Sequence, residues 1–291
     1  MYVSCQGVAA AGADRDEERK EVQLAAGRVR YRDAGEGAPV VFVHGYLVDS
    51  RLWDGVFERL SGRFRCIAPD WPMGAHTIPL DPAADLTPYG FAAIVDDLLA
   101  KLGLEDVTIV GNDSGGAMSQ VLATRHPARV GRLVLTDCDT HENFPPGPFR
   151  LLPPLARVPG GMRLIAAPFR IPAVARAAFR PFTEKRLPPE LIASWMAPST
   201  DPAILRDARK VTAGMHRRYT IEAAERLRGS ALPILFPWAS ADRLFPISAA
   251  ERLADSVQHA EIVPIEDART FVSLDQPERV AAAIARFAES G

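Results

Sequence analysis

The stretch that decides the fold is VTIVGNDSGGAMSQ, residues 107–120. Its first half is apolar and rich in β-branched residues, which predicts a buried strand, and the small residues that follow predict an immediate turn into a helix. The central residue of such a turn has a strained backbone, and its side chain projects at the carboxyl end of the strand. That residue is Asp113, between Asn112 and Ser114. Taken alone, the motif could equally be a glycine-rich turn with a helix-capping aspartate.

On both sides of this turn, strand patterns alternate with helical patterns. A hairpin predicted over 22–35 leads into strands at 39–45, 65–71, 107–113 and 131–139, with helices between them at 51–60, 88–102 and 115–125. Strands that alternate with helices of this length indicate right-handed crossovers. The sequence therefore predicts an α/β fold with a mostly parallel, doubly wound sheet.

The alternation stops at residue 139 and resumes at 231. Residues 140–230 hold 13 of the 25 prolines, no buried strand pattern and a net charge of +8, which leaves −10 for the rest of the chain. We predict a flexible tail over 1–20, a core over 21–139 and 231–291, and a helical lid over 140–230. Ligands of open α/β sheets bind beyond the carboxyl ends of the strands, which is where such a lid would lie.

Composition narrows the class of protein. The chain has 291 residues, of which 47% are hydrophobic and 24% charged, as in globular proteins. It has no apolar run of 18 residues, no signal-peptide pattern and three scattered cysteines, so we expect a cytoplasmic protein. The net charge of −2 predicts no general attraction to nucleic acid or membranes. No nucleotide-binding or metal-binding motif is present, so we expect no cofactor and no metal.

Three features together resemble the α/β-hydrolase superfamily over residues 21–289: the turn at Asp113, VVFVHGY at 40–46, and LDQPERVAAAIARF at 274–287. With aspartate at the turn, the chain looks most like the branch of haloalkane dehalogenases and epoxide hydrolases. The resemblance implies that Asp113 attacks carbon and forms an ester. It also implies an oxyanion site at the backbone N–H groups of Tyr46 and Ser114.

A hydrolytic mechanism also needs an acid and a base. The resemblance places the acid at Asp242, with Asp139 as the alternative; for both, an ordinary loop carboxylate is the competing interpretation. The position that aligns with the catalytic histidine of the relatives is Thr270, and a threonine hydroxyl is not a useful base near neutral pH. His141 follows the strand at 131–139 and is a candidate base, although a surface histidine is the more ordinary assignment.

Other side chains are predicted to line the pocket because they follow strands or lie in the lid. His44 belongs to the oxyanion turn, where we expect it to shape the loop. The remaining candidates are Trp71, Phe144, Trp195, Tyr219, Trp238 and Thr270. For each aromatic residue, plain core packing is the alternative.

Neither named activity of the branch has its usual donors. The halide-binding asparagine and tryptophan are replaced by Tyr46 and Ser114, and Tyr219 is the only tyrosine of the lid region. Three hypotheses follow for a small, largely apolar substrate: a divergent hydrolase with Asp113 as nucleophile, a cofactor-free lyase, isomerase or cyclase of secondary metabolism with Asp113 as acid/base, or a ligand-binding pseudoenzyme. The basic lid could serve an anionic substrate or a carrier protein, or be a solvated arginine-rich surface.

Overall fold

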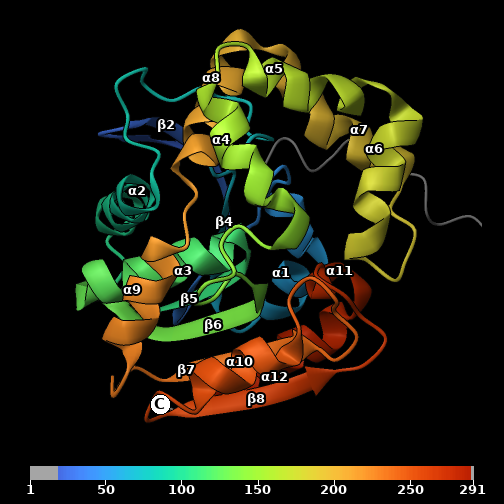
Figure 1. Ribbon diagram of the computed structural model, residues 1–291. Helices are drawn as coiled ribbons and strands as arrows, with labels where there is room; N and C mark the ends of the chain where they lie inside the picture. Colours follow the sequence, from blue (N-terminus) through green and yellow to red (C-terminus); the bar gives the residue numbers. More distant parts are fainter. Residues whose placement is uncertain (1–18, 290–291) are drawn as a thin grey trace, which may run out of the picture.

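The computed structural model describes residues 19–289, and its centre is one eight-stranded sheet (Figure 1). The strand order is β1-β2-β4-β3-β5-β6-β7-β8. β2 is antiparallel to β1 and β4, and all other neighbours are parallel. The bounds are β1 Lys20–Leu24, β2 Gly27–Ala34, β3 Pro39–Val43, β4 Arg65–Pro69, β5 Val107–Asp113, β6 Val130–Cys138, β7 Ile234–Ala239 and β8 Ala260–Ile265. The predicted α/β class, hairpin and mostly parallel sheet are confirmed.

The middle of the sheet is apolar because both of its faces are covered. In β3, Val40, Val41 and Phe42 are fully buried, and Val41 lies opposite Ile109 of β5 in parallel register. Continuous burial without alternation is what a parallel sheet between two helical layers requires. The carboxyl ends of these strands are therefore held by a fully buried, hydrogen-bonded part of the molecule.

Helices cover both faces of the sheet (Figure 1). Buried side chains of α2, α3, α9 and α10 form one hydrophobic cluster with the sheet, and those of α1, α11 and α12 form the other. The bounds are α1 Asp54–Leu60, α2 Pro88–Lys101, α3 Ser114–Arg125, α9 Arg218–Leu227, α10 Ile247–Ala254, α11 Val272–Asp275 and α12 Pro277–Glu289. The expected helix at 51–60 begins as a 3-10 turn, Ser50–Trp53, which Asp49 caps by accepting from Arg51 N.

Residues 140–217 form no strand and fold as short helices above the carboxyl ends of the strands (Figure 1). The helices are α4 Leu152–Arg157, α5 Gly161–Ala166, α6 Pro172–Phe179, α7 Pro189–Met196 and α8 Pro202–Gly214; 3-10 helices cover Gly147–Leu151, Ala167–Arg170, Arg180–Phe182 and Ala197–Thr200. Proline lies in the first turn of most of them, where its missing N–H costs no hydrogen bond. The high proline content therefore starts many short helices.

Two predicted boundaries need correction. Residues 218–227, assigned to the lid, form α9, which lies beside α3 and buries Tyr219, Ala223 and Leu227 in the core cluster (Figure 1). These residues are four apart and share one helical face, so α9 is a sheet-covering helix. The predicted tail over 1–20 ends too late, because Lys20 already pairs with Tyr31 in β1; residues 1–18 of that tail lie outside the described residues. Between residues 19 and 289, no helix is long and apolar enough to cross a bilayer.

Candidate active site

Asp113 lies at the point where β5 ends and α3 begins. Its backbone has φ 52° and ψ −131°, a left-handed conformation that is strained for an aspartate. The turn closes only because its neighbours are small: a Cβ on Gly115 would lie 2.3 Å from the His44 carbonyl oxygen, and one on Gly111 would lie 2.5 Å from Ser119 Oγ. The strained turn predicted from the sequence is thus present, and the side chain of Asp113 points to the carboxyl edge of the sheet.

The carboxylate of Asp113 is held by backbone donors in a poorly solvated place. Tyr46 N donates to Asp113 Oδ2 at 2.9 Å. Burial and, to a smaller extent, the charge of the nearby Asp242 raise the pKa of Asp113, and hydrogen bonds from the backbone N–H groups of Tyr46 and Ser114 lower it, so that the pKa is about 6. Burial therefore outweighs two hydrogen bonds, and the group titrates close to neutral pH.

Asp242 follows β7, and its partner is Thr270. Thr270 Oγ1 donates to Asp242 Oδ2 at 2.7 Å, while Leu244 N and Phe245 N donate to Oδ1 at 2.7 and 3.1 Å. Burial raises the pKa of Asp242, and the bond from Thr270 opposes that shift. Thr270 is itself anchored, because Asn112 Nδ2 donates to its carbonyl oxygen at 2.7 Å. The Thr270 hydroxyl therefore donates to the acid, and the three hydrogen bonds from Thr270, Leu244 and Phe245 stabilise the carboxylate of Asp242 against the effect of burial.

The two alternative acid/base candidates do not form a pair. Asp139 is fully buried, and neither of its carboxylate oxygens has a hydrogen-bond partner among residues 19–289. Burial, with the charge of Asp113 nearby, raises the pKa of Asp139 well above its ordinary value. His141 Nδ1 is likewise without a partner in the described part of the chain, and burial lowers the pKa of this ring. The structure therefore shows no hydrogen bond that would join Asp139 or His141 to an acid/base pair among residues 19–289, and their role as alternative acid or base stays a prediction.

A cavity of about 160 Å³ lies between Asp113 and the lid. Tyr46, Asp113 and Ser114 are its polar residues, and the Tyr46 hydroxyl is already bonded to Thr212 Oγ1 at 2.6 Å. The other walls are apolar, from both core and lid: Leu47, Pro145, Pro146, Phe149, Leu152, Ile165, Phe169, Ala178, Phe179, Phe182, Met215, Leu244 and Phe271. One carboxylate thus faces an almost entirely apolar space, which suits a small, largely apolar ligand.

None of the seven side chains predicted to line the pocket is among the residues that line this cavity. The three tryptophans are fully buried, and each indole N–H donates to a buried acceptor: Trp71 to the Phe42 carbonyl at 2.9 Å, Trp195 to Asp49 Oδ1 at 2.9 Å, and Trp238 to the Phe245 carbonyl at 2.8 Å. A buried indole N–H needs an acceptor, and an apolar cavity offers none.

The other four predicted residues also make their contacts away from the cavity. Tyr219 packs edge-on against Tyr89 with ring centroids 4.6 Å apart, and Phe144 is buried in the core cluster. His44 Nε2 accepts from Trp71 N at 2.8 Å, and its Nδ1 lies 2.9 Å from the Gly45 carbonyl oxygen, so the ring shapes the turn before Tyr46, as expected. Thr270, bonded to Asp242, is only 1% exposed.

None of the six histidines lines the cavity, and all six belong to the described residues. His76 lies 3.4 Å from Asp207, His126 lies 3.3 Å from Asp96, and His216 and His259 are exposed. Residues 19–289 also contain no cluster of three or more histidine, cysteine or acidic residues that could hold a metal ion. The available chemistry of the cavity is that of Asp113 and the backbone N–H groups beside it.

Sequence analysis missed the lid residues that form the roof of the cavity. Ile165 and Phe169 lie four residues apart in MRLIAAPF, 162–169, and Phe179 and Phe182 follow in the next helical stretch. The amphipathic spacing of MRLIAAPF was the available signal, because side chains at i and i+4 share a face. It showed that these residues face inward, while only the assembled lid shows that they face Asp113.

Comparison with known proteins identifies the family. The sequence profile of the alpha/beta hydrolase fold matches residues 38–277. The chain belongs to the α/β-hydrolase fold family. It is 26% identical over 270 residues to haloalkane dehalogenase 2 of Mycobacterium tuberculosis, covering 89% of this chain and 90% of that protein. It is 28% identical over 281 residues to an uncharacterised protein of the same species, covering 90% of this chain and 79% of that protein.

Solved structures show the same fold. The epoxide hydrolase CorEH superposes with a TM-score of 0.77 at 21% identity, covering 92% of this chain and 97% of that one. A meta-cleavage product hydrolase from Pseudomonas fluorescens gives a TM-score of 0.77 at 20% identity, covering 92% of this chain and 96% of that one. The chain is thus an α/β-hydrolase-fold protein that is similar in sequence to a haloalkane dehalogenase, and it shares its fold with an epoxide hydrolase.

Proposed function

We propose that Asp113 is the reacting group of a cofactor-free enzyme that acts on a small, largely apolar organic molecule by proton transfer, as in an isomerase, a lyase or a cyclase. The observation that carries this proposal is the hydrogen bond from Thr270 to Asp242 at 2.7 Å. Hydrolysis of an aspartyl ester needs a group that takes a proton from water. At the place where that group would stand, Thr270 is a donor to the acid and not a base.

Proton transfer needs only what the cavity contains. The Asp113 carboxylate accepts a proton from an acidic C–H group, and the electron pair of that bond forms a new double bond to the neighbouring atom. At the same time that neighbourhood gives up an electron pair, either with a departing leaving group or as the shifted π pair of an adjacent double bond. The protonated Asp113 then returns the proton to product or to water. A pKa of about 6 suits this cycle, because the carboxyl is ionised near neutral pH and remains basic enough to accept a proton.

A hydrolytic function is the second candidate, and the strained turn at Asp113 favours it. A carboxylate on such a turn, with the N–H groups of Tyr46 and Ser114 on it, is arranged as a nucleophile would be. An Asp113 oxygen would attack carbon, a halide or epoxide oxygen would leave with the electron pair, and an ester would form. Because no histidine lines the cavity, we expect that ester to accumulate unless another group activates water.

Nitrobenzisoxazole tests the basicity of Asp113 without a known substrate, because a base that removes its ring C–H proton opens the ring to a coloured phenolate. We expect a rate that rises with pH to a plateau, with a midpoint near 6, and that falls at least about a hundredfold in Asp113→Asn. Thr270→Ser, which keeps the hydroxyl, is the matched control and should react like the parent. Equal rates for the parent and Asp113→Asn would overturn the acid/base proposal.

Bromohexane tests the nucleophilic candidate. If Asp113 attacks carbon, the intact protein gains the mass of one hexyl group, and Asp113→Asn does not. In Thr270→His, a restored base should then release hexanol and place heavy oxygen from labelled water in the Asp113 peptide. A parent protein that neither reacts with bromohexane nor opens nitrobenzisoxazole, but still binds apolar ligands, is the result expected of a binding protein.

A further inference from the structure

The outer surface of the lid repeats one dipeptide, an arginine followed by a large aliphatic residue. It occurs at 150–151, 157–158, 163–164 and 170–171, every six or seven residues, and all eight side chains are exposed. The aliphatic members are Leu151, Val158, Leu164 and Ile171, which are 75%, 54%, 65% and 55% exposed. Side chains of this size are usually buried, so four of them in one regular pattern indicate a surface that binds something.

The charge of this part of the lid is of one sign. Residues 145–182 contain six arginines and no aspartate or glutamate. Arg150, Arg163, Arg170 and Arg176 make no ion pair or hydrogen bond with any residue between 19 and 289. Guanidinium groups without carboxylates nearby leave a local positive potential, although the whole chain has a net charge of −2.

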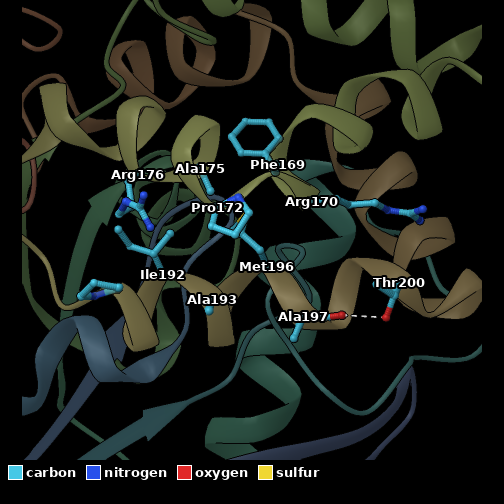
Figure 2. A pocket seen from close by; sticks show the side chains of 11 residues that line it. Phe169, Arg170, Pro172, Ala175, Arg176, Ile192, Ala193, Met196, Ala197 and Thr200 are labelled. Carbon is cyan, nitrogen blue, oxygen red and sulfur yellow. Dashed lines mark hydrogen bonds between the residues drawn. The ribbon is translucent and has the colours of Figure 1, made fainter.

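A groove opens beside the same arginines (Figure 2). It has a volume of about 550 Å³ and lies between α6 and α7. Arg170 and Arg176 stand at its rim, and the buried Ile192 and Met196 form part of its floor. The groove thus offers an apolar chain a place next to two cationic side chains.

We propose that residues 150–176 of the lid dock on the surface of a lipid bilayer that contains anionic head groups. The aliphatic members of the four dipeptides would enter the interface, and the arginines beside them would bind lipid phosphates. An arginine adjacent to an inserted apolar residue can do this because its long stem lies along apolar surface while its charge stays in the polar layer. The absence of acidic side chains from 145–182 removes the repulsion that such docking would otherwise meet.

The inner face of the same segment lines the cavity above Asp113. Phe149 and Leu152 flank the first dipeptide, Ile165 follows the third, and Phe169 precedes the fourth. Docking would therefore bring the roof of the cavity against the bilayer, so an apolar substrate dissolved in lipid could reach Asp113. This delivery role rests on the proposed function, whereas docking itself does not.

Vesicle flotation tests the proposal with the full chain. The parent should float with vesicles that contain phosphatidylglycerol in phosphatidylcholine, and should bind pure phosphatidylcholine at least about tenfold more weakly. We expect a loss of roughly thirtyfold in the double variant Arg163→Ser with Arg170→Ser, and of roughly tenfold in Leu164→Ser with Ile171→Ser. Added salt should weaken the parent's binding.

Three controls separate the explanations. Arg28→Ser with Arg279→Ser removes two exposed charges from β2 and α12, outside the acid-free segment 145–182, and should bind within about twofold of the parent. Asp113→Asn should float like the parent, so loss of the proposed chemistry does not affect this result. Thermal unfolding shows whether each variant is folded. The proposal would be overturned if the parent protein stayed in solution with both vesicle types. It would also be overturned if the control variants lost as much binding as the lid variants, or if the lid instead bound an acidic carrier protein or a second copy of the chain.

Discussion

The sheet domain and residues 145–182 of the lid use the same residue types in opposite ways. In the sheet domain, arginines pair with carboxylates, as Arg65 does with Asp33 at 3.1 Å and Arg129 with Asp96 at 3.3 Å. In the lid segment, four arginines have no such partner within the described residues. The large apolar side chains that are exposed among residues 19–289 all lie between 151 and 174. Many arginines of the sheet domain are thus paired within the chain, whereas the lid segment exposes both arginines without carboxylate partners and large aliphatic side chains.

Truncation of one aliphatic side chain in each region should show the largest difference in stability between the sheet domain and the lid. Ile109→Ala removes a fully buried side chain from β5, and we expect the free energy of unfolding to fall by about 2–5 kcal/mol. Leu164→Ala removes a side chain that is mostly in water, so the change should stay within about 0.5 kcal/mol. Urea unfolding of both variants provides the measurement. A large loss of unfolding free energy in Leu164→Ala would mean that this lid side chain contributes to the core, contrary to the difference inferred between the lid segment and the sheet domain.

Asp113 lies between the sheet domain and the lid. Its burial should destabilise the folded protein when the carboxylate is ionised, so the stability should depend on pH. Its pKa of about 6 in the folded protein is above the ordinary 3.8, so ionisation is disfavoured in the folded state. Stability from this group is therefore fully present below about pH 4 and is lost as the pH rises to about 6. Asp113→Asn does not titrate, so at pH 8 it should be more stable than the parent by up to about 3 kcal/mol.

Denaturant unfolding at pH 4 and pH 8 checks this sign. At pH 4 the variant and the parent should be nearly equal, because the parent's carboxyl is then largely protonated and similar in shape to the amide. A variant that is less stable at pH 8 would show that the carboxylate is well solvated or paired, contrary to its position beneath an apolar lid.

Substitution of Thr270, within the sheet domain, should have a smaller effect on the free energy of unfolding. Thr270→Val keeps the volume but leaves Asp242 Oδ2 without its donor, so we expect a loss of about 1–3 kcal/mol. The pKa of Asp242 should be higher in Thr270→Val than in the parent protein, because the hydrogen bond from Thr270 lowers it in the parent. Thr270→Ser should retain both stability and pKa. Thermal unfolding together with carboxyl titration by NMR measures the two effects; a neutral Thr270→Val would mean that the hydroxyl does not hold the acid.

Some parts of this structure follow from short stretches of chain. The alternation of strands and helices, the strained turn at Asp113 and the absence of histidine at 270 are local features, because each depends on residue type and on periods of two or 3.6 residues. Ile165 and Phe169 were not predicted from the sequence; their spacing of four residues indicates a shared face but does not say what that face contacts. The tryptophans that were predicted to line the pocket do not line it. A position near a strand end does not determine which buried acceptor an indole N–H will bond.

The amino-acid sequence by itself determined the fold class, the place of the lid in the chain and the identity of the carboxylate at the turn. Tertiary structure decided the rest: that Thr270 donates to Asp242 from 28 residues away, that the Asp139 carboxylate has no hydrogen-bond partner between residues 19 and 289, and that Phe149 and Phe179 roof the cavity. The physical reason is that backbone conformation is set by neighbours within one or two turns, whereas burial, hydrogen-bond partners and pKa depend on segments that packing brings together.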